Sequence, residues 1–186
     1  MAVEPSRVLF SVSEYEALGQ IGFFGHDRRL ELIEGEILEM TPIGPEHAGC
    51  VMSLNALFAS RIGDRAVVNV QGPVRLGNLS EPQPDLTVLA PPLEQYRRRH
   101  PEASDILLLV EVADTTARFD RRVKAPMYAR HGIADVWVVD LSAEVVEIHR
   151  EPLPEGYQSV ERHDRGDFVA PLAFPDLTVG VDEILG

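Results

Sequence analysis

The 186 residues suit one domain with a sizeable core and leave little room for a second domain. The composition, 45% hydrophobic and 25% charged, is that of an ordinary globular protein, and no apolar run reaches the roughly 18 residues of a membrane span. A net charge of −13 argues against a nucleic-acid binder with a broad basic surface. Any contact with phosphates must come from local patches: Arg28-Arg29, Arg97-Arg98-Arg99-His100, and the Arg118, Arg121, Arg122 and Lys124 group.

Two features bear on the compartment in which the protein works. Cys50 is the only cysteine, which excludes an internal disulfide framework and fits a reducing compartment. The N-terminal stretch MAVEPSRVLF lacks the basic-then-apolar layout of a secretory signal. We therefore expect a cytoplasmic protein.

The first third of the chain predicts two helices with a hairpin between them. SVSEYEALGQ is typical of a short amphipathic helix, with Ser11 or Ser13 as its N-cap. RLELIEGEILEM alternates apolar and polar residues around Glu34-Gly35, which predicts a β-hairpin. A second helix, from about residue 45 to residue 61, is predicted by apolar side chains at helical spacing: Val51, Leu54, Phe58 and Ile62.

Strands dominate the rest of the chain. RAVVNVQGPVRLG, broken at Gly72-Pro73, and PDLTVLAP predict two strands, and a polar loop leads from them to the buried strand ILLLVEVA. DTTARFDRRVKAPMYARHG predicts a helix that ends at Gly132. ADVWVVDL, EVVEIHR and weaker candidates predict further strands, with core positions at Val136, Trp137 and Val138. This order predicts one α/β or α+β domain over residues 1–186, with helices around a central sheet.

A single carboxylate interrupts the most hydrophobic run of the chain, DILLLVEVAD. Glu111 stands between Val110 and Val112 in a segment that we expect to be buried. A buried carboxylate without a partner costs several kcal/mol, so Glu111 needs compensation. An arginine, a helix N-terminus or a metal ion could supply it, and the residues alone leave these alternatives open.

A second carboxylate, Asp85, opens the strand PDLTVLAP, which we expect beside the strand of Glu111. By strand alternation Asp85 shares a face with Thr87, and Glu111 shares one with Leu107. Two carboxylates on neighbouring strands would make an oxygen-rich site suited to Mg²⁺ or Mn²⁺. The alternative for Asp85 is a residue that caps its own turn. Six histidines without metal-type spacing argue against a zinc site.

The helix expected after the strand of Glu111 carries a possible third member of the site. Asp120, Lys124 and Tyr128 stand at i, i+4 and i+8, so they share one face of that helix. A lysine there could hold a scissile phosphate or orient an attacking water. The same spacing also fits a surface ion pair between Asp120 and Lys124, worth about 0.2–0.5 kcal/mol.

Four further polar residues are secondary candidates. Glu46 and His47 open the predicted long helix, whose first turn could reach a metal pocket; the alternative for His47 is a satisfied, half-buried histidine. Glu31 and Glu34 lie in the predicted hairpin, either as exposed carboxylates or as contacts to a metal or its ligands.

The blocks ELIEGEILEMTPIGPEH, QPDLTVLAP and ILLLVEVADTTARFDRRVKAPMYARHGIADVWVVDL, in this order, resemble the Uma-type family of "putative restriction endonucleases" in the PD-(D/E)XK nuclease superfamily. The resemblance implies a restriction-endonuclease-like core and a Mg²⁺- or Mn²⁺-dependent nuclease, with Asp85 and Glu111 as catalytic metal ligands. The superfamily lysine would stand at Ala113; in this family a lysine of the following helix is thought to replace it, and Lys124 matches. Glu46 or His47 matches a polar position on the first core helix.

One departure from the pattern is Pro126, which could kink the helix that carries Lys124. Three functions therefore fit the sequence. The first is a metal-dependent endonuclease that cleaves DNA, for which a symmetric homodimer is expected. The second is a non-catalytic, homo-oligomeric interaction module, which the acidic charge and Ala113 favour. The third is a hydrolase of another small phosphate ester.

Overall fold

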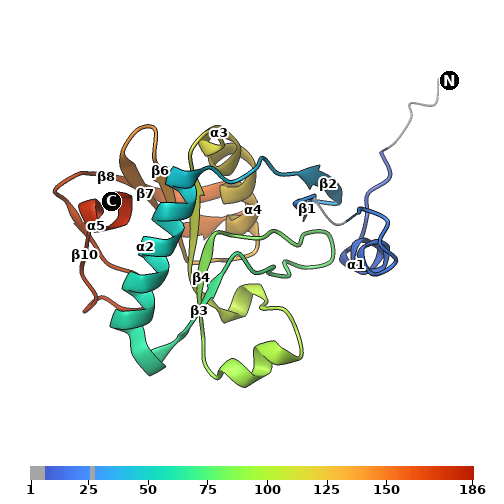
Figure 1. The fold of residues 1–186 in the computed structure, drawn as a ribbon, viewed down its shortest axis with the longest axis horizontal. Helices are drawn as coiled ribbons and strands as arrows, with labels where there is room; N and C mark the ends of the chain where they lie inside the picture. Colours follow the sequence, from blue (N-terminus) through green and yellow to red (C-terminus); the bar gives the residue numbers. More distant parts are fainter. Residues whose placement is uncertain (1–6, 26–27) are drawn as a thin grey trace.

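Six strands form a central mixed sheet in the order β3-β4-β5-β6-β7-β8 (Figure 1). The computed structural model describes residues 7–25 and 28–186; the first six residues, on which part of the secretory-signal expectation rests, lie outside this range. The strands are β3 (Val67–Val70), β4 (Leu86–Leu89), β5 (Ile106–Ala113), β6 (Asp135–Asp140), β7 (Val145–Leu153) and β8 (Gly156–Asp164). Only β5 and β6 pair in parallel among these neighbours. The predicted central sheet is confirmed, and it is a mixed sheet.

Helices cover both faces of the sheet. α2 (Pro45–Ile62) packs on one face through Phe58, whose ring centroid lies 6.0 Å from that of the fully buried Trp137. The other face is covered by α3 (Ala117–Phe119), a π-helical turn (Asp120–Lys124) and α4 (Ala125–Arg130). Because strand side chains alternate, the two faces bury separate hydrophobic clusters.

The hairpin and the first helix lie at one end of the molecule, with β8 and α5 at the other (Figure 1). β1 (Leu30–Ile33) and β2 (Glu36–Glu39) pair around Glu34 and Gly35, whose φ values of 50° and 83° suit a tight two-residue turn. α1 (Val12–Gln20) begins at Ser11, which forms a capping box with Glu14. No helix in residues 7–25 and 28–186 is long and apolar enough to cross a membrane.

A π-helical turn precedes Pro126 in the helical segment after β5. Pro126 has no N–H to donate to the carbonyl of Arg122, as a regular helix would require. The chain widens instead, and the N–H of Ala125 donates to the carbonyl of Asp120, five residues earlier. The proline therefore changes the helix locally without ending it, and Gly132 (φ 75°) follows its last turn as expected.

Three sequence-based expectations were wrong. The strand predicted on both sides of Gly72-Pro73 ends at Val70, and residues 71–85 form a loop with only isolated bridges. Leu107 was expected to share a face of the sheet with Glu111. It packs instead against the cluster on the opposite face, because a bulge between Val88 and Leu89 shifts the strand register beside it. Weak strands were expected up to the end of the chain. The structure has two short strands there, β9 (Phe168–Val169) and β10 (Val179–Gly180), and they are followed by a helix, α5 (Val181–Leu185).

Candidate active site

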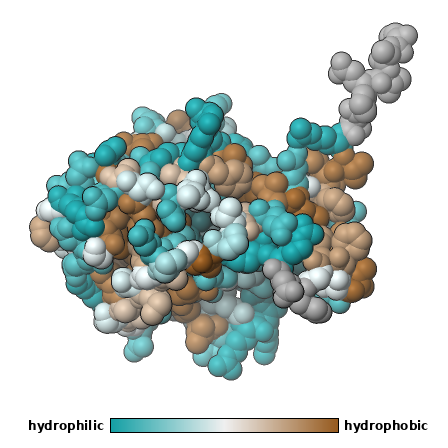
Figure 2. Space-filling model, turned by 45° about the horizontal axis from the view of Figure 1, so that its top comes forward, coloured by the Kyte–Doolittle hydropathy of each residue, from teal (hydrophilic) through white to brown (hydrophobic). Residues whose placement is uncertain are grey.

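A pocket lies where the start of α2, β1, β5 and the α3–α4 segment meet. Its volume is about 60 Å³, enough for a few waters, since one water needs about 10–15 Å³. Figure 2 shows a hollow near the middle of the face that carries the start of α2, bordered mainly by hydrophilic side chains. The titratable side chains that line the pocket include Glu31, His47, Asp85, Glu111, Asp120 and Lys124.

The antiparallel register of β4 and β5 sets Asp85 across from Glu111. Leu86 is paired with Val110, so Asp85 and Glu111 are the next opposing positions. The N–H of Val112 donates to Asp85 Oδ2 over 2.9 Å, which fixes the aspartate against β5. Both carboxylates are buried, with 5% and 3% of their surface exposed, and both line the pocket.

The negative charge of the buried Glu111 carboxylate is offset by a lysine, Lys124. Lys124 Nζ lies 3.1 Å from Glu111 Oε1, and the hydroxyl of Tyr128 donates to the same oxygen over 2.5 Å. Burial raises the pKa of Glu111 well above its ordinary value; Lys124 opposes this shift, and the charges of Asp120, Asp85 and Glu31 add to it. The other oxygen of Glu111 accepts no hydrogen bond from residues 7–25 or 28–186.

Lys124 is the only lysine of the sequence, and it is buried, with 2% of its surface exposed. Its Nζ also lies 3.0 Å from Glu31 Oε2, so it bridges two carboxylates. Burial by itself lowers the pKa of Lys124, but Glu111, Glu31 and Asp120 outweigh it and raise the pKa. The surface ion pair with Asp120 was a wrong alternative, because Asp120 is buried and accepts a hydrogen bond from Thr116 over 2.8 Å.

His47 reaches the pocket from the first turn of α2. Its Nε2 lies 3.1 Å from Asp85 Oδ2, and the Gln71 amide donates to Asp85 Oδ1 over 3.2 Å. Burial would raise the pKa of Asp85, but His47, the N–H of Val112 and Gln71 together lower it. The same hydrogen bond raises the pKa of His47. Sequence reasoning missed Gln71, which has a φ of 50° beside the turn at Gly72-Pro73.

Three candidates from the sequence do not line the pocket. One is Tyr128, which is fully buried and contacts Glu111 through its hydroxyl. Glu34 stands in the hairpin turn and forms an ion pair with Arg130 at 2.5 Å. Glu46 is exposed on α2 and faces away from the pocket that His47 lines. By contrast Glu31, from β1, is buried at the lysine, although an exposed carboxylate was its default interpretation.

The chemistry of the side chains, rather than a preformed ligand geometry, suits the pocket to a divalent cation: among the described residues, no three acidic or histidine side chains of this pocket bring ligand atoms within 4.8 Å of one another. The carboxylates that line the pocket outnumber its two cationic side chains, Arg29 and Lys124; they belong to Glu31, Asp85, Glu111, Asp114 and Asp120. Glu111 has an oxygen free of hydrogen bonds from the described residues, and carboxylate oxygens are the ligands that Mg²⁺ and Mn²⁺ prefer.

Asp120 provides a pH-dependent prediction about stability. Burial raises its pKa from 3.8 to about 6, against the opposing effects of Lys124 and Thr116. Because the pKa of Asp120 is higher in the folded protein, this group stabilises the fold fully below pH 3.8, and its contribution is lost as the pH rises through 6. Its contribution to the free energy of unfolding therefore falls by about 3 kcal/mol between these pH values. We therefore expect Asp120→Asn to raise the free energy of unfolding by up to about 3 kcal/mol at pH 7 and to match wild type near pH 4.

Urea unfolding at both pH values measures this difference. The exposed Asp64→Asn is the control, and we expect it to change stability by less than about 0.5 kcal/mol. An Asp120→Asn effect of equal size at pH 4 and pH 7 would contradict the assignment.

In this mixed sheet two carboxylates lie on neighbouring strands, and a lysine of the next helix lines the same pocket. Residues 12–182 match the Uma2 family model, described as "Putative restriction endonuclease". Because this match spans most of the chain, the protein belongs to the Uma2 family.

Several solved structures are similar to this chain. A "putative nuclease belonging to DUF820" from Anabaena variabilis ATCC 29413 has a TM-score of 0.66 and 17% identity, and the alignment covers 95% of this chain and 97% of that one. This likeness shows the fold. The type IIG restriction endonuclease BpuSI has a TM-score of 0.42 and 15% identity. That alignment covers 78% of this chain and only 16% of the BpuSI chain. No curated protein matches the chain.

Proposed function

We propose that the protein is a divalent-metal-dependent endonuclease that hydrolyses DNA phosphodiester bonds. The observation that carries this proposal is the shared pocket of Asp85, Glu111 and Lys124, in which opposing strand positions supply two carboxylates and the only lysine contacts one of them. The family description supports the same class of reaction.

Asp85 and Glu111 would hold the cation, and Glu31 and Asp120 would add negative charge around it. When bound, Mg²⁺ or Mn²⁺ supplies Lewis-acid chemistry, because it lowers the pKa of a coordinated water and offsets charge on a phosphate. His47 and Gln71 would keep the Asp85 carboxylate oriented, since each contacts one of its two oxygens.

Lys124 would act as a fixed positive charge. Its raised pKa keeps the ammonium protonated, so it is unsuited to remove a proton from water. It can instead hydrogen-bond to a non-bridging phosphate oxygen, where negative charge grows during hydrolysis. Glu31 and Glu111 would keep it pointed into the pocket.

The proposed DNA contacts are local, as the acidic net charge requires. Arg29 lines the pocket, and the exposed Arg118 and Arg122 lie on the segment whose Thr116 and Asp120 also line it. A homodimer, with one pocket for each strand, would suit duplex cleavage. A cytoplasmic setting is part of the proposal, and the single cysteine supports it.

Plasmid nicking by the purified full chain tests this proposal. We expect nicking with Mg²⁺ or Mn²⁺ that a chelator abolishes, and a loss of about 10²–10³-fold in Asp85→Asn. The exposed Asp176→Asn should cleave like wild type. Equal activity in wild type and Asp85→Asn would contradict the proposal, and hydrolysis restricted to nucleotides would indicate a small phosphate ester as the substrate.

A further inference from the structure

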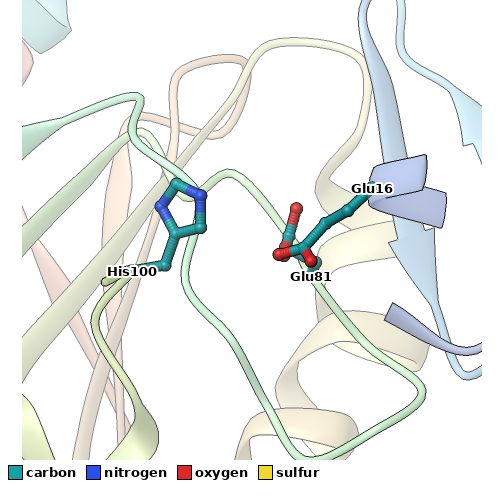
Figure 3. Close-up of side chains that lie close together, drawn as sticks. All are labelled: Glu16, Glu81 and His100. Carbon is teal, nitrogen blue, oxygen red and sulfur yellow. The ribbon is translucent and has the colours of Figure 1, made fainter. Parts of the chain in front are cut away.

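A second cluster of possible metal ligands lies outside the pocket. Glu16 of α1, Glu81 of the β3–β4 loop and His100 of the β4–β5 loop each offer a ligand atom, and these atoms all lie within 4.8 Å of one another. In Figure 3 the carboxylates of Glu16 and Glu81 meet, with the His100 imidazole presented by a neighbouring loop. None of the three lines the pocket of Asp85 and Glu111.

Glu81 is a buried carboxylate of this cluster, and one of its oxygens has no hydrogen-bond donor among the described residues. Only 6% of its surface is exposed, and the oxygen without a donor is the buried Oε2. Burial raises the pKa of Glu81 to about 7, and the charge of Glu16 adds to the shift, while Arg75 opposes it. A buried carboxylate oxygen without a donor beside a second carboxylate is an arrangement that a cation would relieve.

The backbone holds the three ligands in place. The N–H of Glu81 donates to the carbonyl of Leu32 over 2.7 Å, so its segment is fixed to β1. The N–H of Arg75 donates to the carbonyl of Pro101 over 2.7 Å, next to His100. The N–H of Val12 donates to the carbonyl of Asn78 over 2.8 Å, which ties the start of α1 to the loop of Glu81. The ligands therefore come from three segments that already contact one another.

We propose that Glu16, Glu81 and His100 bind one Zn²⁺ ion, with solvent in the remaining coordination position. One imidazole nitrogen and two carboxylates form a donor set that zinc accepts, whereas Mg²⁺ prefers oxygen ligands alone. His100 is exposed, so the ion can enter from solvent. The ion would fasten α1 to both loops, and this role is independent of the proposed cleavage of DNA.

The sequence argued against zinc because the histidines lack metal-type spacing. That argument applies to sites built within one short motif. Here the ligands are far apart along the chain and meet only through tertiary structure. A shared proton between Glu16 and Glu81 is the competing way to relieve their repulsion, and it requires no contribution from His100.

Calorimetric titration of the metal-free full chain with Zn²⁺ tests the site. We expect His100→Asn and Glu81→Gln each to weaken one binding event by at least about tenfold. His131→Asn is the matched control, because His131 lines a different pocket, and it should bind as wild type does. Glu111→Gln should also retain this event, which separates it from any ion in the pocket of Asp85.

A second measurement is the melting temperature with and without Zn²⁺. Zn²⁺ should raise it in wild type and in His131→Asn, and this rise should be lost in His100→Asn. No Zn²⁺ binding by wild type would overturn the proposal in favour of the shared proton. Binding of unchanged strength in both His100→Asn and Glu81→Gln would overturn it as well.

Discussion

Replacing Lys124 with methionine is expected to destabilise the protein by about 3–5 kcal/mol at pH 7. The ammonium lies 3.0 Å from an oxygen of Glu31 and 3.1 Å from an oxygen of Glu111, and all three side chains are buried. Methionine fills similar volume but leaves two carboxylates together without a positive charge. The loss should shrink as the pH falls, because protonation removes the charges that lysine offsets.

Chemical unfolding of the variant and of a matched control measures this loss. Arg122→Met removes a positive charge from the exposed side of the same helical turn, and we expect it to cost less than about 0.5 kcal/mol. The double variant Lys124→Met/Glu111→Gln should recover part of the loss, since one of the unpaired carboxylates is then gone. Similar stabilities for Lys124→Met and Arg122→Met would show that the buried ion pairs do not hold the site together.

Local patterns predicted those parts of the fold that depend on neighbouring residues. The hairpin follows from alternation around Glu34-Gly35, and α2 follows from apolar residues at helical spacing. The face shared by Lys124 and Tyr128 follows from their separation of four residues, which the π-helical turn ending at Lys124 leaves intact. Such features need no knowledge of the tertiary structure.

Contacts between distant segments could not be predicted in this way. Glu31 stands 93 residues before Lys124, and only the packing of the hairpin against the α3–α4 segment brings them together. The exposed-carboxylate interpretation of Glu31 followed from strand alternation, yet all four residues of β1 are buried. The position of Leu107 depended on a bulge, which alternation does not reveal.

Glu111→Gln should separate the stability of the protein from its proposed activity. The folded-state pKa of Glu111 is raised above 4.5, so the contribution of this group to stability is present below pH 4.5 and is lost as the pH rises through the folded-state pKa. At pH 7 a neutral glutamine of the same shape avoids that loss. We expect it to raise the free energy of unfolding of the metal-free protein at pH 7, with no difference near pH 4.

The same substitution should reduce metal-dependent DNA cleavage by about 10²–10³-fold or more, because it removes a proposed metal ligand. It should also abolish any rise in melting temperature with Mg²⁺, which binds the folded wild-type protein in this proposal. Glu46→Gln is the control, since Glu46 is exposed and does not line the pocket, and this substitution should change neither property. In this proposal Glu111 serves cleavage at the expense of stability, and a Glu111→Gln protein that is less stable than wild type at pH 7, or that still nicks DNA, would contradict it.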